Sequence, residues 1–88
     1  MERTDLGKIL LKMVEQETGE KYPGLDEAAN LRQNLSLDSL DMVSLVLRIE
    51  HELKIDIESD ELNETATVGD LLNLLQRKLD GRPERQAA

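Results

Sequence analysis

Apolar residues recur at intervals of three and four in three separate stretches of this chain. An α-helix turns once in about 3.6 residues, so this spacing places the apolar side chains of each stretch on one helical face. Three such faces have to cover one another, which favours helices packed on helices. The repeating positions are Leu6, Ile9, Leu10, Met13 and Val14, then Val43, Val46, Leu47, Ile49 and Leu53, and finally Val68, Leu71, Leu72, Leu75 and Leu79.

Residues that favour helix ends bracket these three stretches. Thr and Asp side chains accept hydrogen bonds from the first N–H groups of a helix, and glycine commonly follows the last turn. A Thr with an Asp three residues later also fits the capping-box pattern, with Asp in place of the usual Glu. The signals are Thr4 and Gly19 for the first helix, Asp38 for the start of the second, and Thr67, Asp70, Gly81 and Pro83 for the last.

The segments between these helices are of unequal length. Residues 19–36 form a long loop with apolar anchors at Leu25, Leu31 and Leu35. Residues 55–57 form an extended connector, and Ser59 starts a single short helical turn. We therefore predict an all-α fold, a small bundle of three main helices plus one short helix, with a long loop between the first two helices. Residues 1–80 form the domain, and residues 81–88 form a disordered tail.

The composition narrows the classes of partner and site. The 88 residues carry a formal net charge of -8 and include no Cys, which rules out disulfides and thiolate metal sites. This charge disfavours nucleic acid, which binds through Lys and Arg, and favours partners with basic patches. No apolar run is long enough to span a membrane, and the charged N-terminus is unlike a signal peptide. We expect a cytoplasmic monomer.

Enzymatic sites are not supported by the residues available. Ser39 lacks the flanking glycines of a nucleophile elbow. The single His, His51, lies about three helical turns further on, roughly 18 Å away, and cannot serve as its general base. The acidic stretch from Asp56 lacks the Gly and the final Glu of a calcium-binding EF-hand loop, so no metal site is predicted.

One cluster of residues could support chemistry by another route. Leu37, Asp38, Ser39, Leu40 and Asp41 lie where the long loop meets the second helix. An Asp-Ser pair at a helix start is ordinary capping chemistry, and these two residues alone favour that interpretation, so the surrounding sequence has to support any other.

The sequence around this cluster resembles the acyl carrier protein family. The segment from Asp38 to Val43 is similar to that family's Asp-Ser-Leu attachment motif. The similarity continues through residues 45–53, the Ile55-Asp56-Ile57 connector, the short acidic turn and the Thr67–Leu71 helix start. It covers about two thirds of the chain, and the first helix and the loop are compatible with it.

The resemblance implies a carrier without catalysis of its own. A phosphopantetheinyl transferase would attach 4′-phosphopantetheine from coenzyme A to Ser39, and the terminal thiol would carry acyl groups as thioesters between acyl-loading and acyl-transfer enzymes. Asp38 would cap the helix and help place the transferase and its metal ion. Leu40, Asp41, Leu47 and Glu50 match positions that meet partners, although Leu40 and Leu47 could equally be core residues and the two acids a solvated surface.

The sequence departs from the family pattern at several positions. Ser36 replaces a frequent Gly, Leu53 replaces a frequent aromatic residue, and Ser44 and His51 stand where fatty-acid-synthesis carriers usually place acids. Arg48 adds a positive charge to the same helix. These differences favour a specialised carrier in lipid, fatty acid or polyketide metabolism. An aminoacyl or peptidyl carrier and an unmodified helical interaction module remain alternatives.

Overall fold

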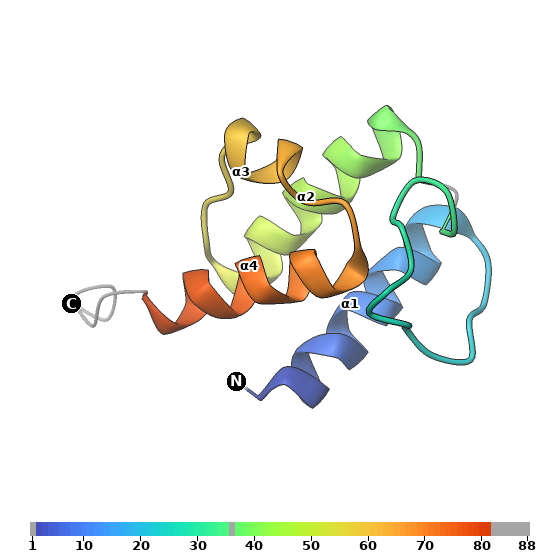
Figure 1. Ribbon diagram of the computed structural model, residues 1–88, viewed down its shortest axis with the longest axis horizontal. Helices are drawn as coiled ribbons and strands as arrows, with labels where there is room; N and C mark the ends of the chain where they lie inside the picture. The colour runs from blue at the N-terminus through green and yellow to red at the C-terminus, as the bar shows by residue number, and fades with distance from the viewer. Residues whose placement is uncertain (1, 36, 82–88) are drawn as a thin grey trace.

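The computed structural model describes residues 2–35 and 37–81, and within these ranges it contains four helices and no strand of a sheet. They are α1 (Arg3–Thr18), α2 (Ser39–Leu53), α3 (Ser59–Asn63) and α4 (Val68–Asp80). Figure 1 shows the long loop on one side of the bundle, where it joins the end of α1 to the start of α2. The predicted all-α bundle of three main helices and one short helix is confirmed. The predicted tail lies almost entirely outside the described residues.

Most of the helix ends follow the sequence signals. Gly19 ends α1 with a left-handed φ of 76°, and its N–H donates to the Glu15 carbonyl. The Thr67 hydroxyl and the Asp70 carboxylate form the predicted capping box at the start of α4. The prediction that Thr4 caps α1 is wrong. The cap position is Glu2, two residues earlier, so the helix begins at Arg3, and no side chain caps it.

One continuous apolar core lies between α1, α2, α4 and the loop. Leu6 and Val14 of α1, Leu45 and Ile49 of α2 and Leu71 of α4 are completely buried. The core consists of aliphatic side chains and Met, because the chain offers a single aromatic residue, Tyr22, which packs at its edge. Burial of each such side chain contributes about 1.5–3 kcal/mol before the entropy of ordering is subtracted.

The long loop is held in place by buried leucines and by a backbone bridge to the segment before α4. Leu31 and Leu35 are buried in the core, as predicted for loop anchors, and Leu25 is partly buried. Asn30 forms an isolated antiparallel bridge with Thr67, just before α4. Because these contacts fix the end of the loop, they also fix the position from which α2 starts.

Arg3 connects the first turn of α1 to the long loop and to α4. Its guanidinium donates two hydrogen bonds to the Glu27 carboxylate in the loop, at 2.9 and 2.6 Å. The same group donates to the side-chain oxygens of Asn73 and Gln76 on α4. One side chain therefore links the first turn of α1, the loop and α4.

The helix α3 is the least embedded of the four. It has five residues, none of them buried, and Leu62 is its only apolar side chain packed against the core. Its Glu61 forms an ion pair of 2.7 Å with Lys78 of α4. A separate finding is that no helix in the described part of the chain is both long and apolar enough to cross a membrane.

Candidate attachment site

Ser39 is the first residue of α2 and its side chain is exposed. No hydrogen bond or ion pair joins its hydroxyl to the described residues. The position follows from the fold, since the buried Leu37 ends the loop against the core and Asp38 then turns the chain into the helix. The sequence cluster at residues 37–41 therefore lies at a loop–helix junction, as predicted.

The capping of α2 is carried out by the neighbours of Ser39. The Asp38 carboxylate accepts a hydrogen bond of 2.8 Å from the Asp41 N–H, and the Asp41 carboxylate accepts one of 3.4 Å from the Asp38 N–H. This reciprocal pair is a capping box, and it satisfies N–H groups that the helix itself leaves without partners. The Ser39 hydroxyl is consequently not needed for the cap and is available for chemistry.

The site fits a phosphodiester attached to the Ser39 oxygen. The exposed hydroxyl leaves room for a tether, and the next side chain, Leu40, is 77% exposed. The start of an α-helix carries a partial positive charge, which favours an attached anion by about 0.3–1 kcal/mol. Asp38 and Asp41 oppose this effect, but each carboxylate is directed at a backbone N–H of the cap.

An exposed apolar patch follows Ser39 along α2. It consists of Leu40, Val43 and Leu47, which are 77%, 52% and 61% exposed, and we call it the α2 patch. Single exposed apolar residues are common, but three on one side of a helix form a surface that a partner can cover. The prediction that Val43 belongs to the core is wrong, because Met42, Leu45 and Ile49 already fill the side of α2 that faces the bundle.

The two acids predicted to meet partners are both partly buried and have structural contacts. Asp41 belongs to the capping box and still lies beside the α2 patch. Glu50 accepts a hydrogen bond of 2.7 Å from the Ile57 N–H in the connector to α3. Sequence reasoning missed this contact, since the two residues are in different elements. Glu50 thus positions the connector, whatever further role it has.

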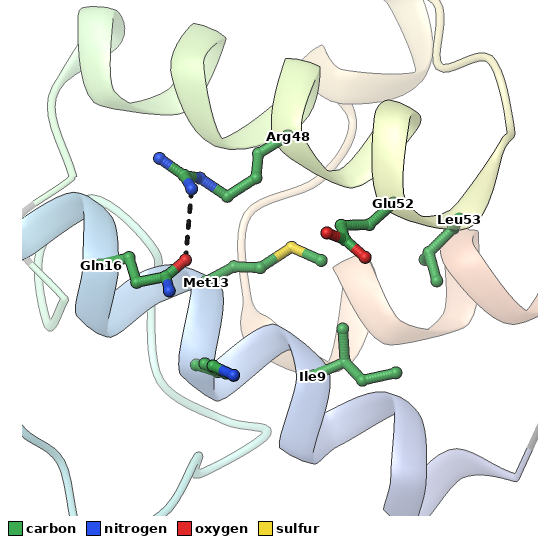
Figure 2. Close-up of a pocket in the computed structure, with 7 residues that line it drawn as sticks. Ile9, Met13, Gln16, Arg48, Glu52 and Leu53 are labelled. Atoms are coloured by element: carbon green, nitrogen blue, oxygen red, sulfur yellow. Dashed lines mark hydrogen bonds between the residues drawn. The ribbon is translucent and has the colours of Figure 1, made fainter.

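Arg48 is directed away from the α2 patch and toward α1. Its guanidinium forms an ion pair of 2.9 Å with Glu17 and donates a hydrogen bond of 3.2 Å to the Gln16 side chain. Figure 2 shows the side chain reaching across to Gln16, at the edge of a pocket that Met13 and Glu52 also line. Its positive charge is therefore compensated by α1 and is not free for a partner.

No histidine and no metal-binding cluster lies beside Ser39 in the part of the chain that the structure describes. His51 is exposed and lies twelve residues further along α2 than Ser39, roughly 18 Å for a helical rise of about 1.5 Å per residue. Among the described residues, no group of three or more His, Asp or Glu side chains could hold a metal ion. No side chain in the described ranges forms a hydrogen bond with the Ser39 hydroxyl.

A small helical bundle with an exposed serine where a long loop meets a main helix is the architecture of a carrier domain. A protein-family profile described as "Phosphopantetheine attachment site" matches residues 8–75. An acyl carrier protein of Cylindrotheca sp. (strain N1) is 33% identical over 76 residues, covering 86% of this chain and 95% of the relative. One of Thermotoga maritima is 29% identical over 77 residues, covering 88% of this chain and 95% of the relative.

A solved acyl carrier protein structure has the same fold as this chain. The crystal structure of an acyl carrier protein from Thermotoga maritima superposes with a TM-score of 0.81 at 29% identity, covering 91% of this chain and 93% of that one. The chain belongs to the acyl carrier protein family. It is a carrier that holds acyl groups, and its prosthetic group is phosphopantetheine.

Proposed function

We propose that the Ser39 hydroxyl is the point of phosphopantetheine attachment. The observation that carries this proposal is the exposure of Ser39 at the first position of α2, with the cap made entirely by Asp38 and Asp41. In the transfer, the Ser39 oxygen loses its proton and forms a bond to the phosphorus of the phosphopantetheine unit of coenzyme A, while the nucleotide part leaves. Once attached, the group supplies the thiol that forms thioesters with acyl groups.

This chain acts in the proposal as the substrate of other enzymes and has no catalysis of its own. His51 lies far along α2, and the Asp38 and Asp41 carboxylates accept backbone N–H groups of the cap and not the Ser39 hydroxyl, so a phosphopantetheinyl transferase has to activate that hydroxyl. Asp38 orients the site by capping the helix, and the family resemblance gives it a second role toward the transferase and its metal ion. The acyl groups are loaded and removed by separate enzymes.

We further propose that these enzymes contact the α2 patch and Asp41. The apolar side chains of Leu40 and Leu47 are available at the surface, and the patch lies on the helix that begins with Ser39. The net charge of -8 attracts partners with basic surfaces. Glu50 contributes less than predicted, since the Ile57 N–H already occupies one of its oxygens. A monomer acting in the cytoplasm remains our prediction.

The α2 surface supports a specialised carrier. Ser44 and His51 are exposed on α2 at positions where the family pattern has acids, so this helix presents fewer acids than that pattern would. We therefore propose a specialised role in lipid, fatty acid or polyketide metabolism. A general fatty-acid-synthesis acyltransferase should load this protein much more slowly than a housekeeping carrier. Equal loading rates would contradict the specialised role and leave the carrier function intact.

Intact-protein mass spectrometry tests the attachment directly. The unmodified protein is incubated with coenzyme A, a divalent cation and a phosphopantetheinyl transferase of broad specificity. We expect a gain of one phosphopantetheine mass for the wild type and none for Ser39→Ala. Ser44→Ala, which removes another exposed hydroxyl of α2, is the matched control and should gain the full mass. No gain for the wild type with an active transferase would favour an unmodified interaction module.

A further inference from the structure

The surface of the bundle has a groove that the carrier function does not use. It lies between the N-terminal half of α1 and the loop after Tyr22, with a volume of about 480 Å³. Volumes of this size are typical of small-molecule sites. We call it the α1–loop groove, and its principal lining residues are Gly7, Lys8, Leu11, Gly24, Leu25 and Leu72.

Two glycines keep this groove open without being required by the fold. A Cβ atom at Gly7 or at Gly24 would meet no atom within 4 Å, and neither residue has a positive φ. Glycine in the interior of a helix is destabilising relative to alanine. The position of Gly7 inside α1 therefore lowers stability without any packing reason within the described chain. At Gly69, by contrast, a Cβ would lie 3.1 Å from the Glu27 carbonyl oxygen, so packing accounts for that glycine.

The walls of the groove are apolar, and three charged side chains, Arg3, Lys8 and Glu27, lie at its rim. Leu11 and Leu25 are partly exposed at the walls, and the buried Leu72 lies beneath them. Of the two cations at the rim, Arg3 is paired with Glu27. Lys8 is exposed, and its ammonium is engaged by no described residue. Since Arg3 and Glu27 compensate each other, Lys8 leaves the lining of the groove with one uncompensated positive charge beside an apolar surface.

We infer that the α1–loop groove binds an unbranched aliphatic monoanion, such as a medium-chain carboxylate. The apolar tail contacts Leu11, Leu25 and Leu72, passes over the two glycines, and places its carboxylate beside the Lys8 ammonium. The inference does not depend on attachment at Ser39.

The experiment is a titration of the unmodified full chain with decanoate, followed by amide NMR shifts below the critical micelle concentration. We expect saturable shifts centred on Gly7, Lys8, Leu11, Gly24 and Leu25. Lys8→Gln should weaken binding about two- to fivefold, the strength of an exposed ion pair. Lys12→Gln is the matched control: it removes an exposed cation one helical turn further along α1 that lines a different pocket, and it should weaken binding much less than Lys8→Gln.

A second variant tests whether the ligand occupies the groove, and a second ligand tests whether its charge contacts Lys8. Gly7→Leu fills the groove with a residue that favours helix, so it should abolish binding while the circular dichroism of the bundle is retained. Decan-1-ol carries no charge, so its binding should be insensitive to Lys8→Gln. Shifts confined to interior residues such as Leu45 and Leu71, no saturation, or an equal effect of Lys12→Gln and Lys8→Gln would each overturn the inference.

Discussion

Asp38 and Asp41 cap α2 reciprocally, each carboxylate accepting a hydrogen bond from the backbone N–H of the other residue. This exchange leaves the hydroxyl of Ser39, which lies between them in sequence, free of any structural task. It also means that Asp38 combines two properties, an acceptor oxygen for the cap and a negative charge. The two can be separated by substitution, because Asn retains the acceptor and loses the charge.

We predict that Asp38→Asn leaves the stability within a few tenths of a kcal/mol of the wild type but slows modification of Ser39. Asp38→Ala should in addition lower the free energy of unfolding by about 1 kcal/mol, since it removes the cap. Urea unfolding and transferase kinetics measure the two effects. Modification of Asp38→Asn at the wild-type rate would show that the negative charge is unimportant to the transferase.

The α2 patch should contribute to partner binding and little to stability. Replacing Leu47, which is 61% exposed, with Ala should change the free energy of unfolding by less than about 0.5 kcal/mol. The same change at the fully buried Leu45 should cost about 2–5 kcal/mol. Thermal unfolding of the two variants provides the comparison. A large loss of stability for Leu47→Ala would show that this side chain belongs to the core.

Glu50 should behave as a structural residue. Glu50→Ala removes the acceptor of the Ile57 N–H, so we expect a loss of about 1–2 kcal/mol in the free energy of unfolding. Glu52→Ala, an exposed acid on the same helix, is the matched control and should change stability by less than about 0.5 kcal/mol. Equal stabilities for the two variants would show that the hydrogen bond from the Ile57 N–H to Glu50 does not stabilise the fold.

Acid should weaken the contact between α3 and α4. The Lys78 ammonium, followed by the Glu58 N–H, holds the pKa of Glu61 below its ordinary value of 4.5. When the folded-state pKa is lowered, the stabilisation is fully present above the unfolded pKa and is lost as the pH falls through the folded pKa. The stability difference between the wild type and Glu61→Gln should therefore narrow below about pH 4.5.

Asp70 and Glu27 should add to the same acid dependence. The N–H groups of Ala66 and Thr67 lower the pKa of Asp70 from 3.8, and the Arg3 guanidinium lowers that of Glu27 from 4.5. Unfolding midpoints from pH 7 to about pH 3 check the direction for all three groups.

The Glu61 experiment has its own control. Glu64→Gln, an exposed acid next to the end of α3, controls for the loss of one negative charge at Glu61. A difference for Glu61→Gln that stays constant down to about pH 3 would contradict the Lys78 contact.

Much of the fold and of the candidate attachment site could be predicted from local pattern. Spacing of three and four fixed the helical faces, and residues such as Gly19 and Thr67 marked their ends. The Asp38–Asp41 capping box could also have been predicted, since Asp41 takes the place of the usual Glu in the same way as Asp70 does in the Thr67–Asp70 capping box. These features depend on neighbours within one turn of helix, where sequence distance and spatial distance agree.

The features that sequence reasoning missed depend on contacts between elements. Val43 has the spacing of a core residue, but the side of α2 on which it lies is left uncovered, and only the packed structure shows this. The Glu50–Ile57 hydrogen bond and the Arg48–Glu17 ion pair likewise join different elements. Periodicity predicts that a helix has an apolar face, but the width of that face is set by what packs against it.

The location of the modification within the chain tests the central claim most directly. Trypsin should release residues 33–48 as one peptide, because Arg32 and Arg48 are the only cleavage points at its ends and none lies between them. This peptide contains Ser36, Ser39 and Ser44, and tandem mass spectrometry of the modified protein distinguishes them. We predict that every fragment carrying phosphopantetheine includes Ser39. Phosphopantetheine on Ser36 or Ser44, or an unmodified peptide after treatment with an active transferase, would contradict the account.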